Sequence, residues 1–135
     1  MRPISLVLIL KNDKLFLSKG KDQVKDITFY RPLGGGIDFG ETSLEAIKRE
    51  IKEELGATLK NEELLKVIEN IFVYNGKNGH EIIFLYKGDI LEQDFYIKEK
   101  MAILDKEGMY AEWVSISDIK NHKVRVFPEE LIEFI

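Results

Sequence analysis

The amino-acid sequence predicts an α/β fold in which helices pack on a mixed central sheet. Three observations support this class. Strand-like apolar runs lie before and after one well-marked helix, that helix carries a single apolar stripe, and no repeat or Pro/Gly/Ser-rich linker divides the chain. Elements with one apolar face must pack in layers around a shared core. The 135 residues match the length of one ordinary domain, so we expect a single domain over residues 1–135.

The first two strands are expected at residues 4–10 and 15–18, two apolar runs separated by a short polar turn. This pattern is typical of a hairpin. The polar segment 19–28 is expected to be a loop. Residues 29–37 contain Pro32 and three successive glycines, so a strand is predicted to run into a glycine loop.

The clearest helix is predicted over residues 43–55. Thr42 and Glu45 have the spacing of a capping box, and Gly56 stands where a helix would end. Apolar residues spaced three and four apart form one stripe that should face a core. These residues are Leu44, Ile47, Ile51 and Leu55.

The second half of the chain is expected to add three strands and two short helices. Strands are predicted at 64–74 and 81–86, joined by a loop over 75–79 that is rich in turn-forming residues. A long loop is expected within the mostly polar segment 88–109. The remaining elements are a strand at 111–116, a brief helix opened by residues 117–119, and a terminal helix from Pro128 to Ile135.

The composition excludes several classes of function. The net charge is −4 and the pI about 5.3, so no general attraction to nucleic acid or to an anionic membrane is expected. The absence of cysteine removes disulfides, thiolate zinc sites and cysteine nucleophiles, and suits a reducing cytosol. The apolar run 4–10 is too short to span a bilayer. We expect a cytoplasmic protein that binds neither a membrane nor a nucleic acid polymer.

Three carboxylates lie close together on the predicted helix. Glu50, Glu53 and Glu54 fall within an arc of about 100° beside the apolar stripe, while Lys48 and Lys52 lie on its far side. The mutual repulsion of three carboxylates should be relieved by a cation, and hard divalent metals prefer oxygen ligands. The alternative to a metal site is a helix face whose charged side chains are simply solvated.

The glycine loop directly precedes this acidic helix, an order that suits a cradle for a metal and phosphates. It is neither a P-loop nor a dinucleotide fingerprint, because G-K-[ST] and G-x-G-x-x-G are both absent.

Together these residues resemble the box of the Nudix hydrolase family, G-x5-E-x7-R-E-U-x-E-E-x-G-U, where U is a bulky aliphatic residue. The chain follows it from Gly35 through Glu41 to the run 49–57, and only Ala57 departs, being smaller than the expected aliphatic residue. The resemblance implies a Nudix-like α/β/α sandwich with a mixed central sheet. It also implies a pyrophosphohydrolase that acts on acid anhydrides.

The resemblance also implies a metal centre, occupied by Mg²⁺ or by Mn²⁺ as a substitute. Its ligands would be carboxylates of the helix, a backbone carbonyl of the glycine loop (Gly35 being the alternative to Gly34) and one carboxylate from a downstream loop. These residues are Glu50, Glu53, Glu54, Gly34 and Glu107. Glu107 belongs to the segment 106–108, which resembles the loop that closes the site in many members.

The implied reaction is an in-line attack of water on phosphorus. Arg49 would pair with a box carboxylate and orient it, and Glu41 would support the geometry of loop and helix. Glu50 and Glu107 both remain candidates for the general base, and Glu112 competes with Glu107 for the role of the distant carboxylate. The residues expected to take part in catalysis are Glu50, Glu53, Glu107 and Arg49.

The implied substrate is a nucleoside diphosphate derivative, such as a nucleoside triphosphate or a dinucleoside polyphosphate. Gly35 and Gly36 are expected to approach its phosphates. Arg31 is expected either to clamp a phosphate oxygen or to form a surface salt bridge. Tyr74 stands where a tyrosine resembles a weak marker of diadenosine polyphosphate hydrolases, although a strand tyrosine more often lies in the core or at a rim.

Two other functions stay open. One is a catalytically silent Nudix-like domain that binds a nucleotide or a protein partner, against which the intact carboxylates argue. The other is a different reaction on the same scaffold, such as isoprenoid diphosphate isomerisation or RNA cap removal, against which the lack of cysteine and of a basic stripe argues. A homodimer also stays open, through apolar C-terminal residues: Leu131, Ile132, Phe134 and Ile135.

Overall fold

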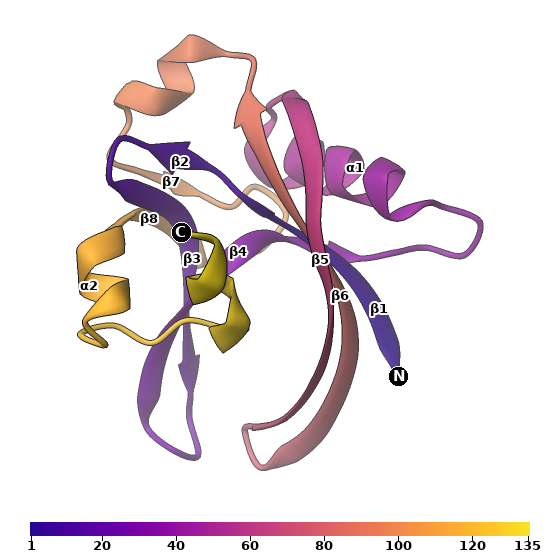
Figure 1. The fold of residues 1–135 in the computed structure, drawn as a ribbon, viewed down its shortest axis with the longest axis vertical. Helices are drawn as coiled ribbons and strands as arrows, with labels where there is room; N and C mark the ends of the chain where they lie inside the picture. The colour runs from indigo at the N-terminus through magenta and orange to yellow at the C-terminus, as the bar shows by residue number, and fades with distance from the viewer.

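The computed structural model describes residues 1–135 and contains one eight-stranded mixed sheet with helices on both faces (Figure 1). The strand order is β5-β6-β1-β4-β3-β8-β7, with β2 paired to β3. The elements in chain order are β1 (Arg2–Leu8), β2 (Leu10–Lys11), β3 (Lys14–Asp22), β4 (Ile27–Gly36), α1 (Ser43–Leu55), β5 (Leu59–Tyr74), β6 (Lys77–Ile90), η1 (Gln93–Ile97), β7 (Lys100–Ala102), β8 (Tyr110–Ser115), α2 (Ile116–Lys120) and η2 (Glu129–Phe134).

Strand β1 lies in the middle of the sheet, parallel to β6 and antiparallel to β4. Successive side chains of a strand point to opposite faces. Accordingly Leu6 and Leu8 belong to one hydrophobic cluster, and Val7 and Ile9 to the other. An apolar run without polar alternation is what a strand covered on both faces requires. The predicted mixed sheet with helices packed on it is therefore confirmed.

Helix α1 covers one face, and its bounds agree with the prediction. The side chain of Thr42 accepts a hydrogen bond from the backbone of Glu45 while the Glu45 carboxylate accepts one from Thr42, and Gly56 ends the helix at a φ of 64°. Ile47 and Ile51 are fully buried. Leu44 was wrongly placed in the stripe: it is 38% exposed, and Ala46 is buried in its stead.

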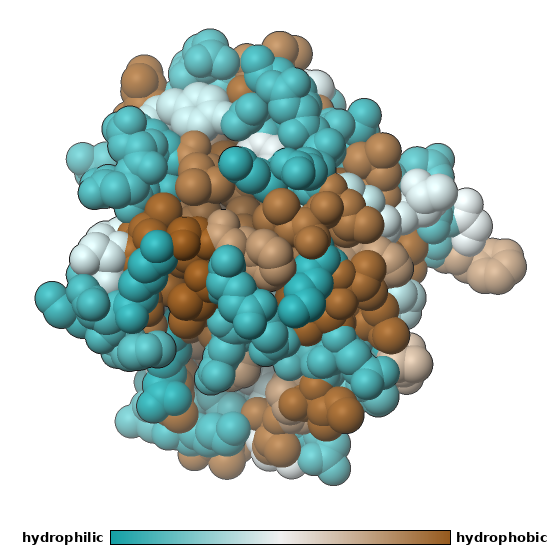
Figure 2. Space-filling view, in the orientation of Figure 1, coloured by the Kyte–Doolittle hydropathy of each residue, from teal (hydrophilic) through white to brown (hydrophobic).

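The opposite face is covered by α2 and η2, whose Ile119 and Leu131 are fully buried. The predicted terminal α-helix is instead a short 3-10 helix, Glu129–Phe134. Ile132, Phe134 and Ile135 pack against the same cluster as Leu131. This C-terminal segment is thus largely used to close the core, and Figure 2 shows apolar side chains gathered on the face that carries it.

Three predicted loops are shorter than expected. Most of 19–28 belongs to β3 and β4, and β6 begins within 75–79, at Lys77. The segment 88–109 contains the end of β6, the 3-10 helix η1 and strand β7. In all three places the backbone hydrogen bonds of a neighbouring strand hold polar residues in an extended conformation, which an apolar pattern cannot reveal.

The β3–β4 and β5–β6 hairpins curve towards each other at the bottom of the view (Figure 1), and their tips are joined by hydrogen bonds. The backbone N–H of Gln23 donates to Oδ1 of Asn75 at 2.7 Å, and the N–H of Asn75 donates to Oδ2 of Asp22 at 3.2 Å. Asp22 is 4% exposed. In none of the helices is there a stretch long and apolar enough to cross a membrane.

Candidate active site

The end of β4 lies directly against β1 and α1, and only glycine fits there. A Cβ on Gly34, whose φ is +143°, would lie 2.0 Å from the carbonyl oxygen of Ser5. A Cβ on Gly35 would lie 2.7 Å from the carboxyl carbon of Glu50. The missing side chains allow the backbone of the loop to approach the acidic side of α1.

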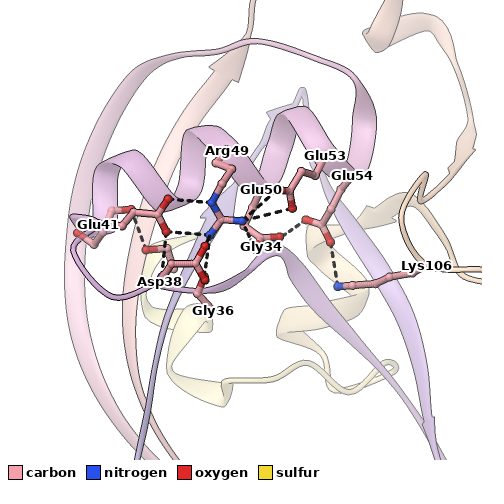
Figure 3. Close-up of polar contacts among 11 residues, drawn as sticks. Gly34, Gly36, Asp38, Glu41, Arg49, Glu50, Glu53, Glu54 and Lys106 are labelled. Carbon is pink, nitrogen blue, oxygen red and sulfur yellow. Dashed lines mark hydrogen bonds and ion pairs between the residues drawn. The ribbon is translucent and has the colours of Figure 1, made fainter.

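Arg49 binds several carboxylates at once (Figure 3). Its Nε and Nη2 donate to the two oxygens of Glu41, both at 2.8 Å, and its Nη1 donates to Glu50 at 3.0 Å and to Glu53 at 3.2 Å. Nη2 also donates to the carbonyl oxygen of Gly36 at 3.0 Å. Arg49 thus pairs with box carboxylates, as expected from the sequence. It also connects the glycine loop to two carboxylates of α1.

Hydrogen bonds from Arg49 lower the pKa of Glu41 to about 2, and Glu41 in turn raises the pKa of the guanidinium above its usual value. Glu41 is therefore ionised across the neutral pH range and holds Arg49 in place. Burial has the opposite effect on Glu50, whose pKa is raised.

Glu54 is the most deeply buried carboxylate of α1, at 1% exposure. Its Oε1 accepts the backbone N–H of Gly34 at 2.9 Å and its Oε2 accepts Nζ of Lys106 at 3.0 Å (Figure 3). Burial raises the pKa of Glu54 to about 7, although Lys106 and the hydrogen bond from Gly34 act in the opposite direction. The Gly34 contact here runs through its N–H, whereas the sequence analysis expected a role for its carbonyl.

A second group of three carboxylates combines one buried and one exposed residue of the same helix with an exposed loop residue. Glu50, Glu53 and Asp105 each present an oxygen, and these oxygens lie within 4.8 Å of one another. Glu107, the expected loop carboxylate, is exposed and does not belong to this group. The competitor Glu112 accepts a hydrogen bond from Tyr30 at 2.9 Å, and burial raises the pKa of that tyrosine to about 12.

Sequence reasoning missed Asp105 and Lys106 as residues that contact the box. Both lie next to Glu107 in the loop after β7, so the loop was identified but the residues that reach α1 were not. The loop is held against α1 by a hydrogen bond of 2.9 Å, which the backbone N–H of Leu104 donates to the carbonyl oxygen of Glu54. No local pattern encodes that tertiary contact.

A cleft of about 420 Å³ opens beside the box, between the β3–β4 and β5–β6 hairpins. One end is lined by Gly34, Gly35 and Glu54, and the hairpin tips lie at the other. Its walls carry four aromatic rings, from Phe29, Phe72, Tyr74 and Phe127. They also carry five cationic side chains, from Arg2, Lys25, Arg31, Lys106 and Arg125.

Of the expected substrate residues, Arg31, Gly35 and Tyr74 line this cleft, and Gly36 does not. Arg31 forms an ion pair with the buried carboxylate of Glu81 at 3.2 Å. Tyr74 lies at the hairpin tips, where its hydroxyl donates to the carbonyl of Lys21 at 3.1 Å and its ring packs edge-on against Phe29. Gly36 lies under the guanidinium of Arg2, a residue that the sequence analysis did not single out.

Comparisons with known proteins agree with this geometry. A family model for the NUDIX domain matches residues 1–134. An RNA pyrophosphohydrolase from Pelagibacter ubique (strain HTCC1062) is 32% identical over 125 residues, covering 87% of this chain and 76% of that protein.

Solved structures share the fold. A NUDIX hydrolase from Nitrosomonas europaea superimposes with a TM-score of 0.68 at 19% identity, covering 98% of this chain and 84% of the other. A MutT NUDIX hydrolase from Burkholderia pseudomallei gives a TM-score of 0.64 at 21% identity, covering 86% and 84%. The family match over nearly the whole chain, the relative and the shared fold lead to one conclusion. The chain belongs to the Nudix family and is a Nudix-type pyrophosphohydrolase.

Proposed function

We propose that the enzyme uses Mg²⁺ to hydrolyse a phosphoanhydride bond in a nucleoside diphosphate-linked substrate, such as a nucleoside triphosphate or a dinucleoside polyphosphate. The observation that carries the proposal is the position of the carboxylate group of Glu50, Glu53 and Asp105 beside a glycine loop that borders an aromatic and cationic cleft. These residues supply candidate groups for the metal, the phosphates and the base.

The donor set fits the proposed ion. All three side chains offer carboxylate oxygens, which hard divalent cations prefer, and such ions commonly complete their coordination with water and phosphate oxygens. Mn²⁺ has the same preference and is expected to substitute. Bound there, the ion would polarise a phosphoryl oxygen and lower the pKa of a water molecule.

The chain's own residues would orient the reactants. Arg49 donates to the carboxylates of Glu50 and Glu53 and would hold both in place for the ion. Glu50 and Glu107 stay the candidates for the base that receives the proton of the attacking water, and the location of Asp105 adds a third. A backbone N–H that donates to a substrate phosphate would come from Gly35 or Gly36, which carry no side chain of their own.

The cleft suits a nucleotide in size and chemistry. Arg2, Arg31 and Lys106 line it together with the box, where phosphates would lie. Phe29 and Phe72 line it further from the box and offer faces on which a base can stack. The volume of about 420 Å³ is that of a small-molecule site.

A second substrate class is favoured by one observation. The relative from Pelagibacter ubique is described as an RNA pyrophosphohydrolase. The same cleft would then take the terminal nucleotide of a 5′-triphosphorylated RNA. The net charge of −4 weighs against a long polyanion, so the small nucleotide is the primary proposal.

The test is a panel assay with Mg²⁺ in ¹⁸O-labelled water. The panel contains nucleoside triphosphates, dinucleoside polyphosphates, ADP-ribose, nucleotide sugars and a 5′-triphosphorylated oligoribonucleotide. Labelled product identifies the phosphorus that is attacked. Preferred cleavage of the oligoribonucleotide would favour the second class, and no cleavage of any compound would contradict the proposed function.

Variants assign the carboxylates. Glu53→Gln and Asp105→Asn should lower the affinity for Mg²⁺, while Glu63→Gln, an exposed glutamate without a side-chain partner on β5, serves as the matched control. If Glu107→Gln loses more affinity for Mg²⁺ than Asp105→Asn does, Glu107 and not Asp105 is the loop carboxylate.

A further inference from the structure

The loop between β7 and β8 brings two oppositely charged side chains to α1. Asp105 approaches Glu50 and Glu53, whereas its neighbour Lys106 reaches Glu54. The loop is fixed next to the helix end, because the N–H of Leu104 donates to the carbonyl of Glu54 at 2.9 Å. One short loop therefore contacts every acidic ligand candidate of the helix.

Both oxygens of Glu54 are already engaged by the protein. Oε1 accepts from Gly34 and Oε2 accepts from Lys106, and 1% of the residue is exposed. An ammonium group at 3.0 Å occupies the position that a cation would take, and two cations repel each other at that distance. Glu54 does not belong to the group of Glu50, Glu53 and Asp105, whose oxygens lie within 4.8 Å of one another.

The side chain of Lys106 can reach a second position, in the cleft. Its side chain is 44% exposed and lines the same cleft as Arg2 and Arg31. A lysine is a compact charge on a flexible stem, so it can change partner by rotating its side-chain bonds. A substrate phosphate bound at the glycine loop would offer it a new anionic partner within the cleft.

We propose that Lys106 is an exchangeable cation: it occupies Glu54 in the metal-free enzyme and moves to a substrate phosphate oxygen when the metal and the substrate bind. The inference rests on the proposed function. Its consequence is coupling, since Lys106 opposes metal binding when the site is otherwise empty and supports phosphate binding once the metal is present. Metal and substrate would therefore bind together more readily than either alone.

The decisive variant is Lys106→Met, because the proposal predicts changes of opposite sign. Without substrate, calorimetric titration with Mg²⁺ alone at about pH 8.5 should show binding that is roughly fivefold tighter, since the competing ammonium is gone. With saturating Mg²⁺, the dissociation constant of imidodiphosphate, a non-hydrolysable pyrophosphate mimic, should rise roughly tenfold, since a charged donor is lost.

Two controls define the comparison. Lys106→Arg keeps the charge and should stay close to the parent in both titrations. Lys123→Met removes an exposed lysine in the turn after α2 and should change neither value. Circular dichroism confirms that each variant is folded.

Two results would overturn the exchange. Weaker binding of both ligands by Lys106→Met would show a merely structural ion pair, and unchanged Mg²⁺ affinity would show that Lys106 does not compete. The panel assay keeps the two proposals apart. Cleavage that depends on Mg²⁺, together with unchanged Mg²⁺ affinity in Lys106→Met, would overturn the exchange alone, whereas no cleavage of any compound would contradict the proposed function.

Discussion

Glu54 combines near-complete burial with a carboxylate that must be available for chemistry. Burial raises its pKa from 4.5 to about 7, so ionising this group in the folded, metal-free protein is unfavourable. In the folded state it binds a proton more tightly than in the unfolded state. The free energy of unfolding therefore falls as the pH rises from about 4.5 to about 7, and the loss is complete above that window.

Glu54→Gln should therefore stabilise the metal-free protein at neutral pH. Gln keeps an acceptor for Gly34 but carries no charge. The pKa shift corresponds to at most about 3 kcal/mol, so we expect a gain of about 1–3 kcal/mol in the free energy of unfolding near pH 8. The gain should shrink towards zero as the pH approaches 4.5. Urea denaturation with a chelator present measures it, and a less stable variant near pH 8 would contradict it.

Arg49 acts through geometry rather than charge alone. Its planar group donates to Glu41, Glu50, Glu53 and the carbonyl of Gly36 at once, which the single ammonium group of lysine cannot do. Arg49→Lys should lower kcat roughly 10- to 100-fold, the usual effect of losing a residue that orients metal ligands. Steady-state kinetics on the best panel substrate measures it. A kcat within about twofold of the parent would remove Arg49 from this role.

At the scale of single elements, α1 was predictable and its surroundings were less so. Both ends of α1 are set by nearby residues, Thr42 and Glu45 at the start and Gly56 at the end, so the sequence carries the whole signal. The extension of β3 to Asp22 depends on backbone bonds to β4, a partner further along the chain.

The same distinction holds within the site. Contacts of Arg49 with box carboxylates follow from helix spacing and the family pattern. The approach of Asp105 and Lys106 to α1 depends on a loop placed by tertiary contacts, and the sequence predicted only which loop it would be. The position of Tyr74, at the hairpin tips, depends likewise on where β5 and β6 turn.

The capping box gives a prediction for α1 as an element. Thr42→Ala removes the acceptor for the N–H of Glu45, and the free energy of unfolding should fall by about 1 kcal/mol. Thr42→Ser keeps the hydroxyl and should lose little. Urea denaturation of both variants at neutral pH provides the measurement. Equal stability of Thr42→Ala and the parent would mean that water caps this helix equally well.

At the scale of the whole molecule, the cleft is closed at one end by the joined hairpin tips. Asp22 accepts the N–H groups of Val24 and Lys25 in its own turn and that of Asn75 in the other hairpin. These hydrogen bonds hold the pKa of Asp22 below its usual value. Because Asp22 connects the tips of the two hairpins, it should control how widely the cleft opens at that end.

Asp22→Ala should release the tips. Each net hydrogen bond contributes about 1 kcal/mol, so amide hydrogen exchange at Asn75 should become roughly fivefold faster or more. The KM of the best substrate should rise with it, whereas kcat should change little because the box is distant along both hairpins. Asp26→Asn, which removes an exposed ion pair with Lys21 in the same turn and keeps a residue that tolerates the φ of 55° there, is the control. Unchanged exchange at Asn75 would show that the aromatic contacts alone hold the tips.

The central location of β1 also governs the order in which the fold can be completed. Its neighbours in the sheet are β4 and β6, and the parallel partner residues 81–87 follow it in sequence by nearly eighty positions. During synthesis, a strand whose last five residues are all buried in the native fold must therefore wait, with one edge unpaired, until more than half the chain has been made. Such distant pairing predicts slow folding and a nascent chain that needs protection from aggregation before β6 emerges.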